Sequence, residues 1–145
     1  EIKELFVSDS KELFKYRTVK DAIGNLPLDW DIDSLKYNNH FGTKTKVKIN
    51  GMIGNRETIW DKPSPTIMGR GSGTGGPLII PHPELHRRMT IREVARIQTF
   101  PDQMLFLGSN SAQYRQIGNA IPVMFSFFLG DLFNEIIEKN SERIS

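Results

Sequence analysis

Hydrophobic residues recur at helical spacing in the last part of the chain. From Pro122 to about Lys139 they follow the i, i+3, i+4, i+7 pattern of an amphipathic helix. The stripe comprises Phe125, Phe128, Leu129, Leu132, Phe133 and Ile136, and it is widened by Val123, Met124 and Phe127. So broad an apolar surface needs a large partner surface. The middle of the chain looks too small and too polar to cover it, so we expect another structure to do so.

Three shorter helices are predicted from their start signals. Thr90 and Glu93 form a capping box, and the helix that follows ends before Pro101, burying Ile91, Val94, Ala95 and Gln98. Thr18 and Asp21 begin a helix of about two turns that stops at Gly24. Residues 111–117 form the third.

Between Tyr37 and Pro81 the pattern changes to short β-type segments. Lys44–Ile49 alternates strictly, which predicts a strand with its lysines on one solvated face. Further short strands are predicted at 58–60, 66–68 and 78–80. Gly69–Gly76 holds five glycines in eight residues but lacks the ending of a nucleotide P-loop. It is either a linker or a loop that lets two backbones approach closely, with Arg70 inside it.

The stretch Gln113–Pro122 joins the last two predicted helices. Gly118 and Asn119 tolerate the left-handed backbone that often ends a helix, and Pro122 suits the first turn of the next one. One interpretation is a plain helix–corner–helix. The other is a corner that offers backbone N–H groups and a short amide side chain to a ligand.

The net charge of +2 hides a basic middle between acidic ends. Residues 36–62 hold six basic and two acidic side chains, and residues 63–100 hold five and two, so these segments carry +7 together. Such a centre is an electrostatic footprint for a polyanion, or else a solvated face.

Several classes of protein are excluded or disfavoured by composition. The chain has no cysteine, which excludes disulfides, cysteine-bound metal and a thiol nucleophile. The three histidines, His40, His82 and His86, have no cysteine partners, so we expect no metal site. We also expect no membrane-spanning run and no signal peptide. The chain begins with Glu1 rather than Met, as a piece cut from a longer protein would.

Arg88–Asp102 followed by Gln113–Pro122 resembles the last two motifs of DNA cytosine-5 methyltransferases, in order and in spacing. Thr18–Pro27 and Asp61–Ile67 resemble segments that precede those motifs. The resemblance implies an α+β chain: a small strand-and-loop target-recognition domain, plus C-terminal helices that complete a Rossmann-like methyltransferase domain. It places a connector from the catalytic core at 1–36, the target-recognition domain at 37–87 and the returning helices at 88–145.

The resemblance also implies roles in methyl transfer. Family members flip the target cytosine out of double-stranded DNA, attack C6 with a cysteine and transfer a methyl group from S-adenosylmethionine to C5. Thr66 matches a family contact to the phosphate beside the flipped base. Arg56 has the spacing of an arginine that reads guanine, or it contacts phosphate or solvent. Further DNA contacts are expected from Arg70, Lys44, Lys46 and Lys48.

For the cofactor, the resemblance implies contacts from Asn119 and Ala120, with Gly118 beside them and Phe100 near the same pocket. Arg88, Arg92 and Arg96 would orient the recognition domain through ion pairs or phosphates. The helix after Pro122 would dock on the catalytic domain.

The chain departs from the family because its cofactor motif, nucleophile loop and cytosine-holding segments are missing. We therefore expect no catalytic residue here and no methylation by the chain alone. The resemblance implies a fragment of a single-chain bacterial enzyme or the small subunit of a split one, which we expect to be cytoplasmic and associated with the nucleoid. The alternatives are a non-catalytic DNA-binding module and an α+β domain that binds RNA or protein.

Overall fold

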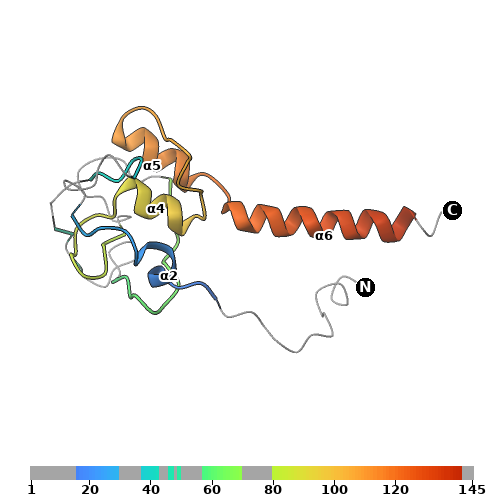
Figure 1. Cartoon of the computed structure of the whole chain (residues 1–145), viewed down its shortest axis with the longest axis horizontal. Helices are drawn as coiled ribbons and strands as arrows, with labels where there is room; N and C mark the ends of the chain where they lie inside the picture. Colours follow the sequence, from blue (N-terminus) through green and yellow to red (C-terminus); the bar gives the residue numbers. More distant parts are fainter. Residues whose placement is uncertain are drawn as a thin grey trace.

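The computed structural model describes residues 16–29, 37–42, 46–47, 49, 57–69 and 80–141. Within these ranges lie helices α2 (Val19–Ile23), α4 (Ile91–Ile97), α5 (Asn110–Gly118) and α6 (Val123–Ser141). Figure 1 shows α2, α4 and α5 gathered in one body with loops around them, and α6 projecting away from that body.

The predicted capping box at Thr90 and the predicted capped helix start at Thr18 are confirmed. Thr18 and Asp21 cap the start of α2 reciprocally, and Thr90 and Glu93 do the same for α4. In each case the hydroxyl accepts from the N–H of the acidic residue, whose carboxylate accepts from the N–H of the threonine. The two helices pack against each other, and α4 also packs on α5.

The hydrophobic core of the described residues lies where these three helices meet. It draws on residues of all three helices and on loop residues beside them: Val19, Ala22, Ile23, Leu26, Met89, Ile91, Val94, Ala95, Phe106, Tyr114 and Ile117. The predicted buried side of α4 is confirmed for Ile91, Val94, Ala95 and Gln98.

The predicted strands at 58–60 and 66–68 are wrong, because neither segment forms a ladder. The carbonyl oxygens of Trp60 and Lys62 instead accept hydrogen bonds from the first N–H groups of α2, at 2.9 and 3.0 Å. Pro63 and Pro65 have no N–H to donate. In the part of the chain that the structure describes, pairing is limited to isolated bridges, Lys46 with Arg87 and Pro81 with Arg88. Half of the predicted strand at 44–49 and most of that at 78–80 lie outside the described residues.

The corner between α5 and α6 also differs from its prediction. Gly118 is the last helical residue of α5, and Asn119 has φ −89°, so neither is left-handed. Pro122 directly precedes α6, and its carbonyl oxygen accepts from the N–H of Ser126 at 3.1 Å.

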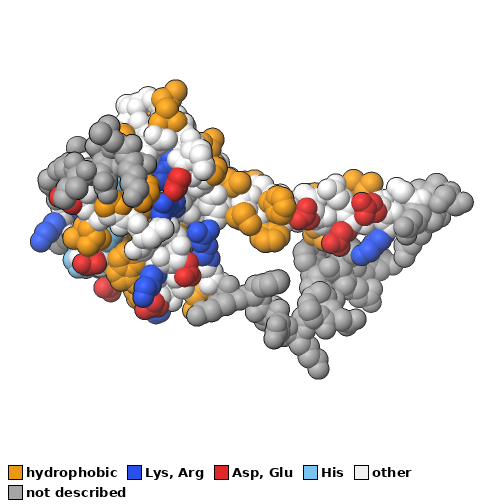
Figure 2. Space-filling view, in the orientation of Figure 1, with side chains coloured by type: hydrophobic (Ala, Val, Ile, Leu, Met, Phe, Trp, Pro, Cys, Tyr) orange, Lys and Arg blue, Asp and Glu red, His pale blue; other side chains and the backbone are white. Residues whose placement is uncertain are grey.

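Helix α6 has no buried residue. Figure 2 shows hydrophobic side chains along its first half and charged ones towards its far end; the exposed large ones are Val123, Met124, Phe125, Phe127, Phe128, Phe133 and Ile137. By length and composition alone the stretch Asn110–Ser141 could cross a membrane, contrary to the sequence expectation. One such stretch is weak support for a membrane span, since a helix face that packs on another domain passes the same test.

Candidate cofactor and DNA interface

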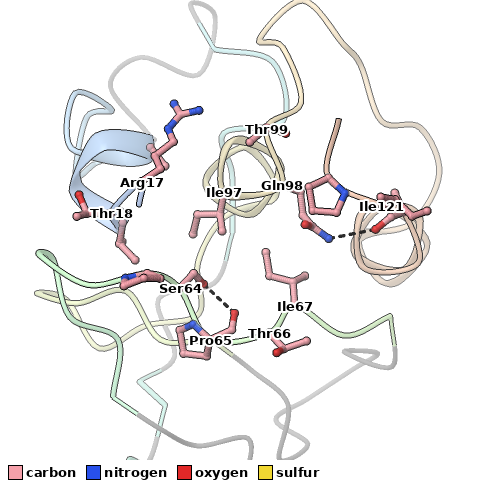
Figure 3. A pocket seen from close by; sticks show the side chains of 15 residues that line it. Arg17, Thr18, Ser64, Pro65, Thr66, Ile67, Ile97, Gln98, Thr99 and Ile121 are labelled. Atoms are coloured by element: carbon pink, nitrogen blue, oxygen red, sulfur yellow. Dashed lines mark hydrogen bonds between the residues drawn. The ribbon is translucent and has the colours of Figure 1, made fainter. Parts of the chain in front are cut away.

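A cavity of about 520 Å³ lies between α2, the segment Pro63–Ile67, the end of α4 and the α5–α6 corner (Figure 3). Most of its wall is apolar. Its polar groups are Arg17, Thr18, Ser64, Thr66, Gln98 and Thr99, and no acidic side chain of the described residues lines it. A concave, mainly apolar site with a few polar groups is the usual form of a ligand site.

Gln98 binds the corner that forms one wall of this cavity. Its side-chain amide donates to the carbonyl oxygens of Ile117 at 3.2 Å and Ala120 at 3.3 Å. The backbone carbonyl oxygen of Gln98 accepts from the N–H of Val123 at 3.2 Å. Gln98 is buried, so these bonds are shielded from water. The end of α4 therefore fixes where α5 stops and α6 begins.

The segment Met68–Gly69, which follows Thr66, contacts the same corner through its backbone atoms. A Cβ built on Gly118 would lie 2.6 Å from the Met68 carbonyl carbon and from the Gly69 nitrogen. The side chain of Asn119 lies directly over Gly69, where a Cβ would overlap its Oδ1. The glycines allow a contact that larger residues would prevent.

The predicted site residues are distributed unevenly around this site. Ala120 and Thr66 line the cavity, and Gly118 and Asn119 form the corner beside it. Phe100 does not line the cavity; its ring packs edge-on against Phe106, with centroids 5.2 Å apart.

The predicted DNA contacts other than Thr66 are less fully described. The exposed Lys46 is bridged to Arg87, outside the cavity wall. Arg56, Arg70, Lys44 and Lys48 lie outside the described residues.

Arg92 is the largest fully buried side chain in the described region. Its guanidinium donates to three carbonyl oxygens: Asn38 at 2.7 Å, Pro101 at 3.0 Å and Met104 at 2.5 Å. Burial lowers the pKa of Arg92. This arginine ties two loops to α4.

The other arginines of the motif are also engaged within the protein. Arg96 forms a two-point ion pair with Asp102, with both distances between 2.5 and 2.7 Å. Arg88 stacks over Tyr114, with Cζ 3.4 Å from the ring centroid. Burial raises the pKa of Tyr114 to about 12, and its hydroxyl donates to the carbonyl oxygen of Met89. The predicted ion pairing is thus confirmed for Arg96 and also for Arg92, whose Nη1 lies 3.8 Å from the Asp102 carboxylate.

Arg87 forms the buried ion pair of the region. Its two terminal nitrogens donate to the Glu93 carboxylate at 2.8 and 2.9 Å. Burial alone would raise the pKa of Glu93, but the hydrogen bonds and charge of Arg87 lower it. Glu93 therefore stays ionised while it also caps α4.

Two buried polar residues were not singled out by the sequence pattern. The Asn39 side chain exchanges hydrogen bonds of 2.9 Å with the backbone of Phe106, and it donates to Gln113 at 3.0 Å. Asn39 has φ 60°, which asparagine tolerates better than most residues. The asparagine pair before His40 was the available signal, because asparagine favours such positions.

His40 connects two segments inside the body. Nδ1 lies 3.0 Å from the Thr90 hydroxyl and Nε2 lies 2.9 Å from the Pro27 carbonyl oxygen. A carbonyl can only accept, so Nε2 carries the proton and Nδ1 accepts from Thr90. Burial lowers the pKa of His40 and that of His82. Within the described ranges, no cluster of three or more histidine or acidic side chains could hold a metal ion.

The C-5 cytosine-specific DNA methylase family model matches residues 4–134, so the chain belongs to that family. Among curated proteins, it is 43% identical over 88 residues to the type II methyltransferase M.Eco47II of Escherichia coli, matching 61% of this chain and 21% of that protein. It is 34% identical over 140 residues to M.BsuRI of Bacillus subtilis, matching 77% of this chain and 29% of the relative. The chain therefore spans less than a third of the length of these relatives.

Residues of the corner suit one side of an S-adenosylmethionine site. They offer the Asn119 side chain beside the cavity and the apolar wall at Ala120, whereas the N–H groups of Asn119 and Ala120 already donate to the carbonyl oxygens of Arg115 and Ile117. The ribose hydroxyls of nucleotide cofactors are commonly bound by an acidic side chain, and none lines the described cavity. The corner therefore fits part of the cofactor, and other groups would have to come from elsewhere.

Proposed function

We propose that this chain is the C-terminal part of a bacterial DNA (cytosine-5) methyltransferase. Residues 37–87 form the target-recognition domain, residues 88–145 return to the catalytic domain, and residues 1–36 connect the two. The chain recognises double-stranded DNA and completes the S-adenosylmethionine pocket. A catalytic core outside these residues provides the cysteine that attacks the target base.

One observation carries the proposal. The corner at Gly118–Ala120 and the segment at Thr66–Gly69 meet around one cavity, although they lie about 50 residues apart in the sequence. The first is the proposed cofactor contact, and the second is the proposed phosphate contact. Methyl transfer to a flipped base needs cofactor and DNA backbone close together, and this arrangement supplies that proximity.

The exposed face of α6 supports the proposed junction with the catalytic domain. Phe128 is 62% exposed and Phe133 is 59% exposed, and none of the helix is buried. Large contiguous apolar patches are uncommon on free surfaces and mark interaction sites. The family match extends to residue 134, well inside α6, which favours the catalytic domain over a membrane as the partner.

The residues of this chain would bind and orient, and they would not form a covalent bond to the base. S-adenosylmethionine supplies the methyl group when bound. The Thr66 hydroxyl would donate to a DNA phosphate at the cavity rim. Asn119 and the apolar side chain of Ala120 would hold one side of the cofactor, while Gln98 keeps the backbone of the corner in place.

The test is Asn119→Ala in the assembled enzyme, that is, this chain together with its catalytic core. We expect the variant to weaken S-adenosylmethionine binding more than DNA binding. Asn134→Ala is the matched control, because it removes the same side chain from an exposed position of α6 that lies 15 residues beyond Asn119. If Asn119→Ala weakened DNA binding more than cofactor binding, the asparagine would have only a structural role in the corner.

The absence of cysteine from the chain keeps two further assignments open. The chain is either a natural small subunit of a split enzyme or a DNA-binding module without a catalytic partner. Purification of the chain from its source separates them: a cysteine-bearing methyltransferase partner supports the first, and DNA binding without such a partner supports the second. In each case we place the chain in the bacterial cytoplasm at the nucleoid.

A further inference from the structure

Thr99 has a backbone conformation that is unusual for its residue type. Its φ is 62°, in the left-handed region. Within the described residues, Asn39 and His86 share a positive φ, but asparagine and histidine are enriched there, whereas a β-branched residue is a true outlier. Such strain persists only where the surrounding structure requires it, so an outlier of this kind calls for a functional explanation.

The end of α4 explains the left-handed backbone but not the threonine. The N–H of Phe100 donates to the Ala95 carbonyl oxygen at 2.9 Å, and the N–H of Thr99 donates to that of Arg96 at 3.0 Å. This pair of bonds is a Schellman motif, in which the left-handed position is usually glycine. A glycine at 99 would make the same two bonds without strain.

The threonine side chain performs a task that glycine cannot. Its Oγ1 accepts a hydrogen bond from the N–H of Met124 at 2.9 Å, in the first turn of α6. The first N–H groups of a helix need such acceptors, and the proline that precedes α6 has no side-chain oxygen to offer. Thr99 is therefore the N-terminal cap of α6, supplied from a different helix end.

The neighbouring Gln98 holds the other side of the same corner. Its side-chain amide donates to the carbonyl oxygens of Ile117 and Ala120, and its backbone carbonyl oxygen accepts from the N–H of Val123. The Gln98–Thr99 pair thus contacts the end of α5, the corner itself and the start of α6. Both residues also line the cavity (Figure 3).

We propose that Thr99 is a positioning residue for the methyl donor: its hydroxyl fixes the start of α6 and thereby the corner that contacts the cofactor. This inference rests on the proposed function of the corner. The strained threonine is retained because the position of α6 depends on its oxygen, although glycine would suit the backbone better. The prediction that follows is that replacing Thr99 by glycine lowers cofactor affinity without lowering fold stability below that of the valine variant.

Three variants of the assembled methyltransferase separate the hydroxyl from the strain. Thr99→Ser keeps the acceptor, Thr99→Val keeps the branched shape and removes the acceptor, and Thr99→Gly removes both the acceptor and the strain. S-adenosylmethionine affinity is measured by titration calorimetry and by its KM, with kcat, DNA affinity and Tm measured alongside. We expect a roughly five- to tenfold weaker affinity for S-adenosylmethionine in the valine and glycine variants, the size of one lost helix cap.

The serine variant should retain cofactor affinity close to that of the unmodified enzyme. The glycine variant should lose affinity while its Tm is equal to or above that of the valine variant. Cofactor affinity that simply follows Tm across the series would overturn the positioning role, and so would valine and glycine variants that bind the cofactor normally. If the unmodified assembled enzyme binds no S-adenosylmethionine, the proposed function fails as well, which distinguishes the two failures.

Discussion

Gly118 approaches Gly69 so closely that a Cβ on Gly118 would lie 2.6 Å from the Gly69 nitrogen. Real Cβ atoms essentially never come that near to backbone. The two glycines therefore join the end of α5 to the segment that follows Thr66. In the proposed enzyme this contact links the residues beside the cofactor to those beside the DNA backbone.

Replacing Gly118 by alanine should separate these two segments. Because the clash is with backbone, it cannot be relieved by a rotamer change, and we expect a loss of roughly 1–3 kcal/mol in the free energy of unfolding. Urea denaturation of the chain measures it. Gly130→Ala in α6 is the control, since its Cβ would meet nothing within 4 Å and should raise helix stability by roughly 0.5–1 kcal/mol. Equal effects of the two alanines would refute the close-contact argument.

Arg92→Lys should destabilise the chain although the charge is retained. The planar guanidinium serves three carbonyl oxygens in different directions, and an ammonium on a flexible stem cannot match that geometry. The three bonds are partly buried, and each hydrogen bond from a charged donor contributes roughly 1.5–3 kcal/mol, so thermal unfolding should show a fall of several degrees in Tm. The exposed Arg115→Lys is the matched control and should leave Tm unchanged. An unchanged Tm in Arg92→Lys would mean that the loops at 38 and 101–104 do not depend on the arginine.

Acid should destabilise the fold through its buried histidines. Burial lowers the pKa of His40 and His82 below the ordinary value of 6.5, so the unfolded chain binds protons more readily than the folded chain. Their contribution is complete above pH 6.5 and is lost as the pH falls through 6.5 towards the folded pKa. Each unit of pKa difference corresponds to about 1.4 kcal/mol.

Unfolding free energies at pH 7.5 and 5.5 test this dependence. His40→Gln keeps a donor towards the Pro27 carbonyl and cannot be protonated, so it should flatten the pH dependence. His86→Asn is the control at an exposed position with φ 53°, which asparagine accepts. A pH profile unaltered by His40→Gln would assign the acid sensitivity to other groups.

Binding to duplex DNA should weaken steeply with salt. The middle of the chain carries +7, and basic groups that neutralise phosphates release counterions when they bind. Fluorescence anisotropy of the assembled enzyme between 50 and 200 mM salt should show a linear fall of log affinity against log salt concentration, by roughly tenfold or more. A flat affinity would leave the basic centre without its proposed role, and equal affinity for duplex RNA would favour the RNA-binding alternative.

Local signals predicted the helices well, because each is specified by residues adjacent in sequence. The threonine–acid pair that begins α4 was readable as a capping box and the pair that begins α2 as a capped helix start, and the structure forms a capping box at both. The β-type segments at 58–60 and 66–68 failed because their backbone partners are distant: the carbonyl of Trp60 binds the start of α2, some 40 residues earlier.

The sequence motifs predicted which residues belong to the candidate site, but not how these residues contact one another. Gly118 was expected to be needed for a left-handed turn, whereas it is needed for contact with Gly69, which no local pattern reveals. The roles of Gln98 and Thr99 were equally hidden, since both depend on bonds to residues about 20–25 positions away. The buried hydrogen bonds of Asn39 and His40 were not predicted, because polar residues that connect distant segments leave no periodic pattern in the sequence.

The most direct test of the central claim is covalent trapping in an extract of the source organism. Duplex DNA containing 5-fluorocytosine, incubated with S-adenosylmethionine, should retain the attacking cysteine of a cytosine-5 methyltransferase on the base. We predict that peptides of this chain are found in the trapped polypeptide itself or in a subunit that co-purifies with it. An adduct that forms without this chain, covalently or as a bound subunit, would contradict its assignment as part of the methyltransferase.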